Sequence, residues 1–171
     1  MLNDKMQEAL NSQLNAELFS SYLYLAMSAY LKTAGFDGFS HWMRVQAQEE
    51  MVHGAMFYDY ILSRDGKVAL AQIEKPDAVW GSPLEAAEAT LAHERKVTGL
   101  INTLMELAHA EKDYAAVQFL QWFVAEQVEE EASAEDLVRK LKLAGSDGSA
   151  LLMIDGELSQ RPALYQVPPA K

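Results

Sequence analysis

The stretch Gln48-Glu49-Glu50-Met51-Val52-His53 places a glutamate and a histidine, Glu50 and His53, three residues apart on one face of a predicted helix. That face leads on to Phe57 and Ile61, so it is the apolar side of the element. Taken alone, the pair has an ordinary explanation as a solvated glutamate beside a satisfied histidine. Its meaning therefore depends on what the rest of the chain places at the same depth.

Other apolar stripes also carry polar residues. Glu17 stands between Leu14 and Tyr24, and Glu94 interrupts a second stripe. A third stripe, in the last long helical segment, carries both Gln127 and Glu130. Acids on core-facing positions are informative because charged side chains are almost never fully buried without a partner.

The spacing of these residues repeats between the two halves of the chain. Glu17 precedes Glu50 by 33 residues, and Glu94 precedes Gln127 by the same 33 residues. A further polar residue follows three positions later in each half, and the halves are related by an offset of 77 residues. Two antiparallel helix pairs with equal spacing can place these side chains at one level of a bundle.

Apolar periodicity predicts an all-α fold with four long helices and a short fifth. The predicted elements run from about Asp4 to Ala34, Asp37 to Arg64, Ser82 to Ala110, Asp113 to Ala144 and Asp147 to Glu157. Ser82 with Pro83 and Glu85 predicts a capping box at the third start. The link of 17 residues from Asp65 to Gly81 can extend roughly 56 Å. A helix of about 28 residues spans roughly 42 Å, so the link can cross the bundle end to end.

Composition narrows the classes of protein that remain. The chain of 171 residues contains no cysteine, which excludes disulfides, zinc–thiolate sites and iron–sulfur clusters. Its formal net charge of -11 argues against a nucleic-acid partner. The N-terminus lacks a signal-peptide pattern, and the uncharged run from Leu18 to Leu31 is too short to span a membrane. We therefore expect a cytoplasmic protein without membrane contact.

Four carboxylates at one level of a dry core would repel each other and be costly to desolvate. No Lys or Arg lies on the inner stripes of the predicted helices, which leaves protonation or bound metal. Two divalent cations would balance the formal charge of Glu17, Glu50, Glu94 and Glu130. Oxygen ligands with one imidazole suit iron or manganese. Zinc remains open, whereas calcium accommodates a histidine ligand poorly.

This pattern resembles the ferritin-like di-iron proteins, and most closely the non-haem ferritins of bacteria. That bundle has a Glu from each of two helices and a Glu-x-x-His from each of the other two. Here Glu17 and the stretch from Gln48 to His53 match the first half. The second half departs with Gln127-Val128-Glu129-Glu130, and Phe119 to Gln127 is similar to the non-haem ferritins. The resemblance covers residues 1–158, predicted as the bundle domain, and leaves 159–171 as an irregular tail.

The resemblance implies a ferroxidase centre that binds two iron ions inside each subunit. The side chains that resemble its ligands are Glu17, Glu50, His53, Glu94 and Glu130, with Glu50 as the bridge between the two ions. Gln127 resembles the residue that hydrogen-bonds within the centre, and Tyr24 resembles the tyrosine beside it. Glu49, Glu126 and Glu129, with Glu130, resemble the ligands of a third iron site. For these outer acids a merely solvated face remains an equal alternative.

The function implied is iron storage and detoxification, with Fe(II) oxidised by dioxygen or hydrogen peroxide inside a homo-oligomeric shell of 24 subunits. One alternative is a haem-containing bacterioferritin, because Met51 stands where those proteins carry a haem-ligating methionine. The Gln-x-x-Glu of the second half speaks against it, so we expect no haem and interpret Met51 as an interface or packing residue. A di-iron peroxidase or oxygenase without storage also stays open, as does a metal-free structural bundle. Trp122 is predicted to pack in the core.

Overall fold

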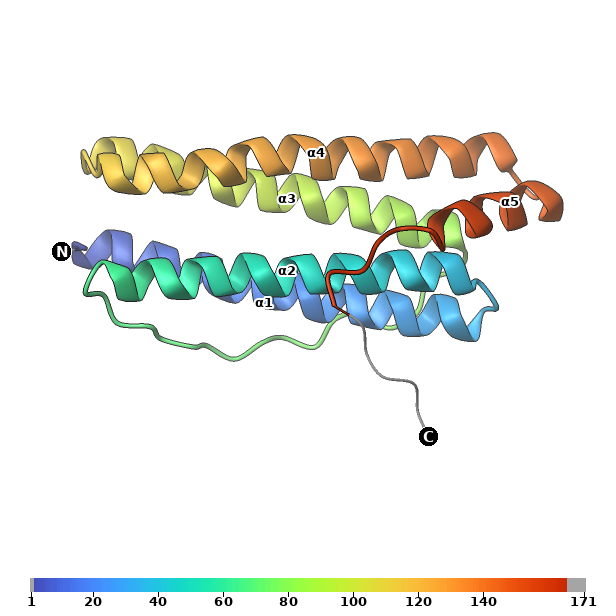
Figure 1. The fold of residues 1–171 in the computed structure, drawn as a ribbon, viewed down its shortest axis with the longest axis horizontal. Coiled ribbons are helices and arrows are strands. Elements are labelled where there is room, and N and C mark those ends of the chain that lie inside the picture. The colour runs from blue at the N-terminus through green and yellow to red at the C-terminus, as the bar shows by residue number, and fades with distance from the viewer. Residues whose placement is uncertain (1, 166–171) are drawn as a thin grey trace.

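The computed structural model describes residues 2–165 and is all-helical over that range. Its elements are α1 (Asp4–Thr33), α2 (Asp37–Ser63), α3 (Pro83–Ala110), α4 (Tyr114–Ala144) and α5 (Gly148–Leu158). Four long helices lie side by side, and α5 turns across one end (Figure 1). The predicted fold class is confirmed, and each helix begins and ends within one residue of its expected position. No helix in the described range is long and apolar enough to cross a bilayer.

The link between α2 and α3 runs the length of the bundle along α1 (Figure 1). Polar side chains of α1 fix its first part: Lys67 N donates to Gln7 Oε1 at 2.7 Å, and Ala69 N donates to Asn11 Oδ1 at 2.7 Å. The short links on either side make α1 and α2 antiparallel, and likewise α3 and α4. The crossover therefore leaves α2 and α3 parallel (Figure 1).

The start of α3 follows the predicted cap with one difference. Ser82 Oγ accepts a hydrogen bond from Glu85 N at 3.1 Å, as a capping box requires. The Glu85 carboxylate reaches back to Gly81 N at 2.6 Å rather than to the backbone of Ser82. The box thus closes one residue earlier than expected, on the last residue of the crossover.

The start of α2 is capped from a distant part of the chain. Its own N-cap residue, Phe36, makes no side-chain capping bond. Asp155 of α5 supplies it instead, because its Oδ1 accepts from Phe39 N at 2.9 Å. A Cβ added to Gly38 would lie 1.7 Å from the Asp155 carbonyl oxygen, so only glycine permits this approach. The contact docks α5 against α2.

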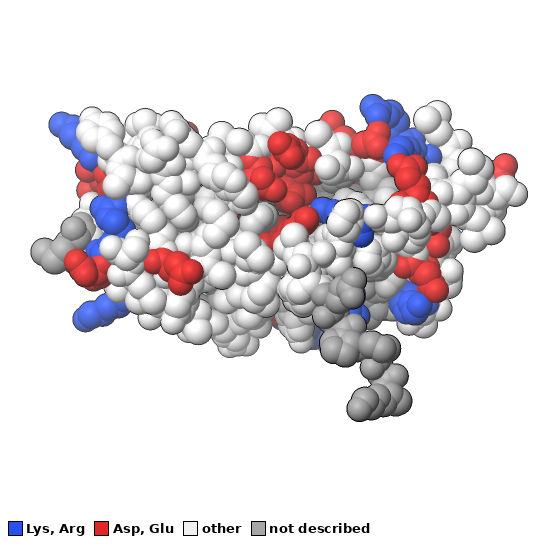
Figure 2. All heavy atoms as spheres, viewed as in Figure 1, with Lys and Arg blue, Asp and Glu red and all other residues white. Residues whose placement is uncertain are grey.

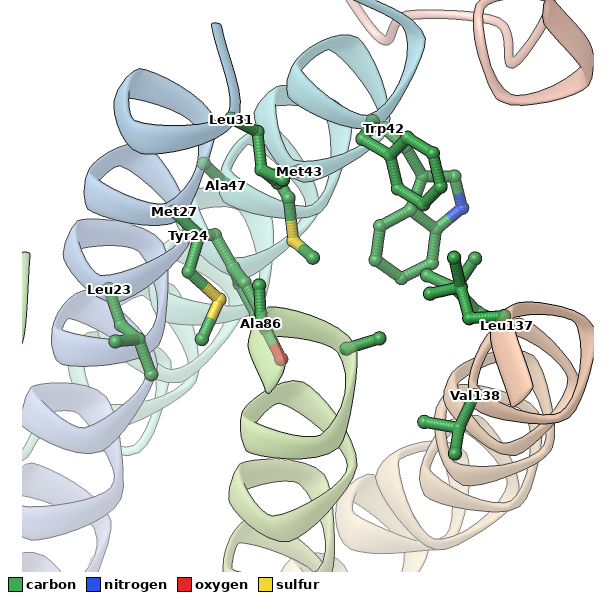
Figure 3. Close-up of a cluster of buried hydrophobic side chains, with 13 residues drawn as sticks. Leu23, Tyr24, Met27, Leu31, Trp42, Met43, Ala47, Ala86, Leu137 and Val138 are labelled. Carbon is green, nitrogen blue, oxygen red and sulfur yellow. The ribbon is translucent and has the colours of Figure 1, made fainter. Parts of the chain in front are cut away.

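Buried apolar side chains form two clusters rather than one continuous core. One cluster includes Tyr24, Met27, Leu31, Met43 and Leu137, contributed by α1, α2 and α4 and closed by alanines of α3 (Figure 3). The other includes Met6, Leu10, Phe57, Ile101, Leu120 and Phe123. Along every long helix the residues between the two clusters are the polar ones singled out by the sequence. The bundle thus carries a buried polar layer at mid-length.

Candidate metal centre

The first half of the polar layer brings Glu17, Glu50 and His53 together. One ligand atom from each residue lies within 4.8 Å of the others. All three side chains are buried, with exposed fractions of 1%, 2% and 4% respectively. The helical spacing explains the arrangement, because residues three apart on α2 present both ligand atoms to the same point on α1. Two carboxylates and an imidazole converge there as potential metal ligands.

The second half contributes Glu94 from α3 and Glu130 from α4, both also buried. The phenol of Tyr24 donates a hydrogen bond to Glu94 Oε1. Gln127 Nε2 lies 3.3 Å from both Glu94 Oε2 and the Glu94 carbonyl oxygen, and 3.2 Å from Thr98 Oγ1. The side chains of Tyr24 and Gln127 therefore orient Glu94 from two sides.

Two further amides hold the carboxylates and were not singled out from the sequence. Gln46 Nε2 donates to Glu130 Oε2 at 2.8 Å, and Gln13 Nε2 donates to Glu17 Oε1 at 2.9 Å. Gln13 precedes Glu17 by one helical turn, so its spacing was a usable signal. Gln46 and Glu130 are 84 positions apart, and nothing local in the sequence pairs them.

The four inner carboxylates are held in an environment that disfavours their charge. Burial raises the pKa of Glu17 well above its usual value, and the neighbouring Glu50 raises it further. The pKa of Glu50 is likewise raised by burial and then by Glu94. Burial also raises the pKa of Glu94, although hydrogen bonds from Tyr24 and Gln127 oppose this. The pKa of Glu130 rises to about 7 because of burial and the Glu94 charge. Protons or divalent cations would relieve this repulsion.

The outer acids are less enclosed. Glu49 is half-buried and pairs with Arg161, whose Nη2 lies 2.5 Å from Glu49 Oε2. The charge of Glu126 lies near enough to raise the pKa of Glu49, although burial contributes most to that rise. Glu126 is partly exposed and Glu129 is exposed. Within the described residues no hydrogen bond or ion pair draws Glu129 to the others. The structure thus brings Glu49 to the rim of the polar layer and leaves Glu129 on the surface.

The structure corrects the prediction for Trp122 and adds to the prediction for Met51. Trp122 was predicted to pack in the core, but its side chain is 43% exposed and meets the His53 ring edge-on, with centroids 5.4 Å apart. The reason is that Trp122 stands at the edge of the α4 stripe, where Phe123 takes the buried position. Met51 is 46% exposed, so it contributes little to packing within the chain and its surface is available to an interface.

His93, which had no role assigned from the sequence, packs behind the centre. Its Nε2 lies 2.8 Å from Ser20 Oγ, and its ring meets Tyr24 edge-on at 5.9 Å. Burial, with a smaller contribution from Lys96, lowers the pKa of His93 to about 4, so the ring is neutral near pH 7. The imidazole therefore packs edge-on against Tyr24 and is held by Ser20.

Known proteins resemble this chain over nearly its whole length. Residues 7–144 match the model of the ferritin-like domain. A bacterial non-haem ferritin of Bacteroides fragilis (strain 638R) is 48% identical over 164 residues, covering 94% of this chain and all of the relative. A bacterial non-haem ferritin of Staphylococcus epidermidis (strain RP62A) is 41% identical, covering 94% of this chain and 97% of that protein.

Solved structures give the same result. The open-pore ferritin from the hyperthermophilic archaeon Archaeoglobus fulgidus superposes with a TM-score of 0.94 at 52% identity, covering 95% of this chain and all of that one. An engineered closed form of the same ferritin also superposes with a TM-score of 0.94, covering 95% of this chain and 99% of its own. The sequence matches and the superposed structures each extend over nearly the full length of this chain and of its relative. The chain therefore belongs to the bacterial non-haem ferritins of the ferritin family.

Proposed function

We propose that the chain is an iron-storage subunit that oxidises Fe(II) at the buried polar layer. The observation that carries the proposal is the convergence of Glu17, Glu50 and His53 in a layer that also holds the buried carboxylates of Glu94 and Glu130. None of the described helices adds a buried Lys or Arg to this layer. Two ferrous ions would bring four positive charges to these four carboxylates. This balance of charge favours the binding of ferrous ions in the layer, because buried carboxylates without a partner are strongly unfavourable.

The proposed ligand roles combine these positions with the resemblance to the non-haem ferritins. Glu17, Glu50 and His53 would hold the first ion, and Glu50 would bridge to the second. Glu94 and Glu130 would hold that second ion from the opposite helix pair. The hydrogen bonds from Tyr24, Gln127, Gln46 and Gln13 keep these carboxylates oriented before iron arrives.

The reaction balances with two ferrous ions and one oxidant. Each Fe(II) gives up one electron, and dioxygen takes both electrons with two protons to become hydrogen peroxide. When hydrogen peroxide is the oxidant, the same two electrons and two protons convert it to two molecules of water. The Fe(III) products then hydrolyse to oxyhydroxide and release protons. Paired ions close together let one oxidant receive both electrons at a single site.

Storage requires an enclosed space, and we propose a homo-oligomeric shell of 24 subunits in the cytoplasm. Large apolar side chains on α1 and α2 are exposed, among them Tyr22, Leu25, Tyr58 and Leu62. Leu152 and Met153 of α5 are exposed as well. Apolar surface of this kind on a single chain indicates contact with further copies.

Anaerobic titration with Fe(II), followed by oxygen, on protein sized by chromatography tests the proposal. The expected result is two ferrous ions bound tightly per subunit, rapid oxidation, and ferric mineral retained in a large particle. Absence of stoichiometric binding would overturn it. Haem absorption in the purified protein would support a bacterioferritin instead. A small oligomer that turns over peroxide without mineral would support a non-storage peroxidase.

A further inference from the structure

After α5 the chain turns back and runs along α2 (Figure 1). We call residues 159–165 the returning segment. The side chain of His41 holds its start, with Nε2 lying 2.8 Å from the Arg161 carbonyl oxygen. The amide of Gln48 holds its end, because Nε2 donates to the Tyr165 carbonyl at 3.0 Å and Oε1 accepts from Leu164 N at 3.0 Å. Both anchors are side chains of α2, so the segment has a defined path.

That path delivers Arg161 to the rim of the polar layer. Its guanidinium lies 4.8 Å from the centroid of the Trp42 ring and pairs with Glu49 at 2.5 Å. Arg161 Nη1 is buried without a hydrogen-bond partner in the described residues. A buried donor left unpaired is unfavourable, so this position costs the side chain some of the free energy that its ion pair supplies. The contact is therefore held partly by the anchors on either side.

The positive charge of Arg161 also acts on one of the inner carboxylates. This charge opposes the rise in the pKa of Glu130, as it does for Glu49, so the guanidinium acts on both carboxylates. Figure 2 shows a basic group directly beside acidic side chains halfway along the molecule. The described long helices place no such cation in the buried layer. It arrives from the returning segment and pairs with Glu49, one of the outer acids.

Arg161 engages one oxygen of Glu49, Oε2, and so places a positive charge beside the whole carboxylate. A metal ion shared by Glu49, Glu126 and Glu130 would need the carboxylate that Arg161 now engages. A divalent ion brings twice the charge of a guanidinium and can compete for it, and because the two cations repel each other the guanidinium opposes binding of the ion. We propose that Arg161 is a displaceable cation that occupies Glu49 and disfavours metal binding there. The returning segment would thereby control whether a third iron ion can bind beside the di-iron centre.

The proposal rests on the function proposed above and adds a control that the ligand residues alone would not provide. When Arg161 engages Glu49, ions are confined to the two inner positions. When an ion displaces it, the returning segment loses one of its contacts to α2 and loosens. Movement of iron outward from the centre is thereby tied to movement of the returning segment.

Anaerobic calorimetric titration of the assembled protein with Fe(II) alone tests the idea in Arg161→Ala. The expected result is two unchanged tight sites and a third ion bound at least roughly tenfold more tightly than in wild type. Adding Glu126→Gln to Arg161→Ala should remove that gain, which locates the ion. Arg139→Ala is the matched control, because Arg139 is an exposed arginine paired with Asp136 on α4. It should leave all sites unchanged.

Hydrogen exchange of residues 159–165 provides the second measurement. In wild type, exchange there should rise only as the third equivalent of Fe(II) binds. Gln48→Ala keeps the Arg161 charge but frees the end of the returning segment, so exchange should already be fast without iron and the third ion should bind more tightly. Equal third-ion affinity in wild type and Arg161→Ala, or unchanged exchange on filling, would overturn the inference. Absence of two tight Fe(II) sites from the wild-type protein would instead refute the proposed function.

Discussion

The phenol of Tyr24 on α1 donates its hydrogen bond to the carboxylate of Glu94 on α3, across the centre of the bundle. Both groups are buried, and the His93 ring supports the tyrosine from behind. This contact joins the two helix pairs at the level of the centre. It means that Glu94 is oriented by a residue of the opposite hairpin.

Replacing Tyr24 with Phe should slow iron oxidation roughly tenfold or more while two ferrous ions still bind. The ring continues to fill its space, but Glu94 loses one of the donors that fix it. Stopped-flow oxidation and anaerobic binding measure the two effects separately. Tyr30→Phe is the control, since Tyr30 packs on Trp80 away from the centre. Equal slowing in both variants would contradict the assignment.

Glu50→Ala should abolish fast oxidation and leave the apo fold intact. The proposed bridging ligand is lost, but so is one of four charges that repel each other, which offsets the small cavity. Thermal melting of the apo protein and oxidation rates provide the measurements. Glu106→Ala removes an exposed glutamate of α3 and should affect neither. Oxidation at the wild-type rate in Glu50→Ala would refute the bridging role.

The apo protein should lose stability as pH rises from about 4.5 to about 7. Glu130 ionises near 4.5 in an unfolded chain but near 7 in the folded one, so its contribution is complete at low pH and lost on the way up. Since metal binds the ionised carboxylates, the rise in melting temperature caused by Zn(II) should be larger at pH 7.5 than at pH 5.5. Glu130→Gln should flatten the apo profile. A profile with the same slope in that variant would show that other groups cause the dependence.

Gly38→Ala should loosen α5, because the added methyl group would collide with the Asp155 carbonyl. We expect lower thermal stability and faster hydrogen exchange over residues 148–158. Gly99→Ala is a matched change inside α3, where no atom lies within 4 Å of the added carbon. It should instead stabilise the helix by up to about 1 kcal/mol. A loss of stability in Gly38→Ala together with a gain in Gly99→Ala would show that the collision with Asp155, and not helix propensity, causes the loss.

Local patterns were sufficient to predict the helices and the polar layer. Periodicity located each long helix, and equal spacing in the two halves predicted that Glu17, Glu50 and Glu94 would share one depth. These features depend on positions along single helices, which a sequence displays directly. In the structure all three glutamates are buried, as that repeat led us to expect.

Contacts between distant segments were not predictable in the same way. The Arg161–Glu49 pair joins positions 112 apart, and the Asp155 cap of α2 joins positions 116 apart. Both depend on how α5 turns back, which no periodicity encodes. Trp122 was misplaced for a related reason, because one position of rotation on α4 decides whether Trp122 or Phe123 faces inward. The ligand roles and the division at residue 158 stay predictions.

The division of the interior into two apolar clusters has a mechanical consequence. Each cluster joins the long helices near one end, so separating either end would expose a large apolar area. Parting the helices slightly at mid-length would break mainly polar contacts, which water can replace, and a few aromatic ones. Apolar packing is thus densest toward the ends of the bundle and sparsest in its middle, where the proposed iron site lies. Transient widening at that level would admit them without weakening the fold as a whole.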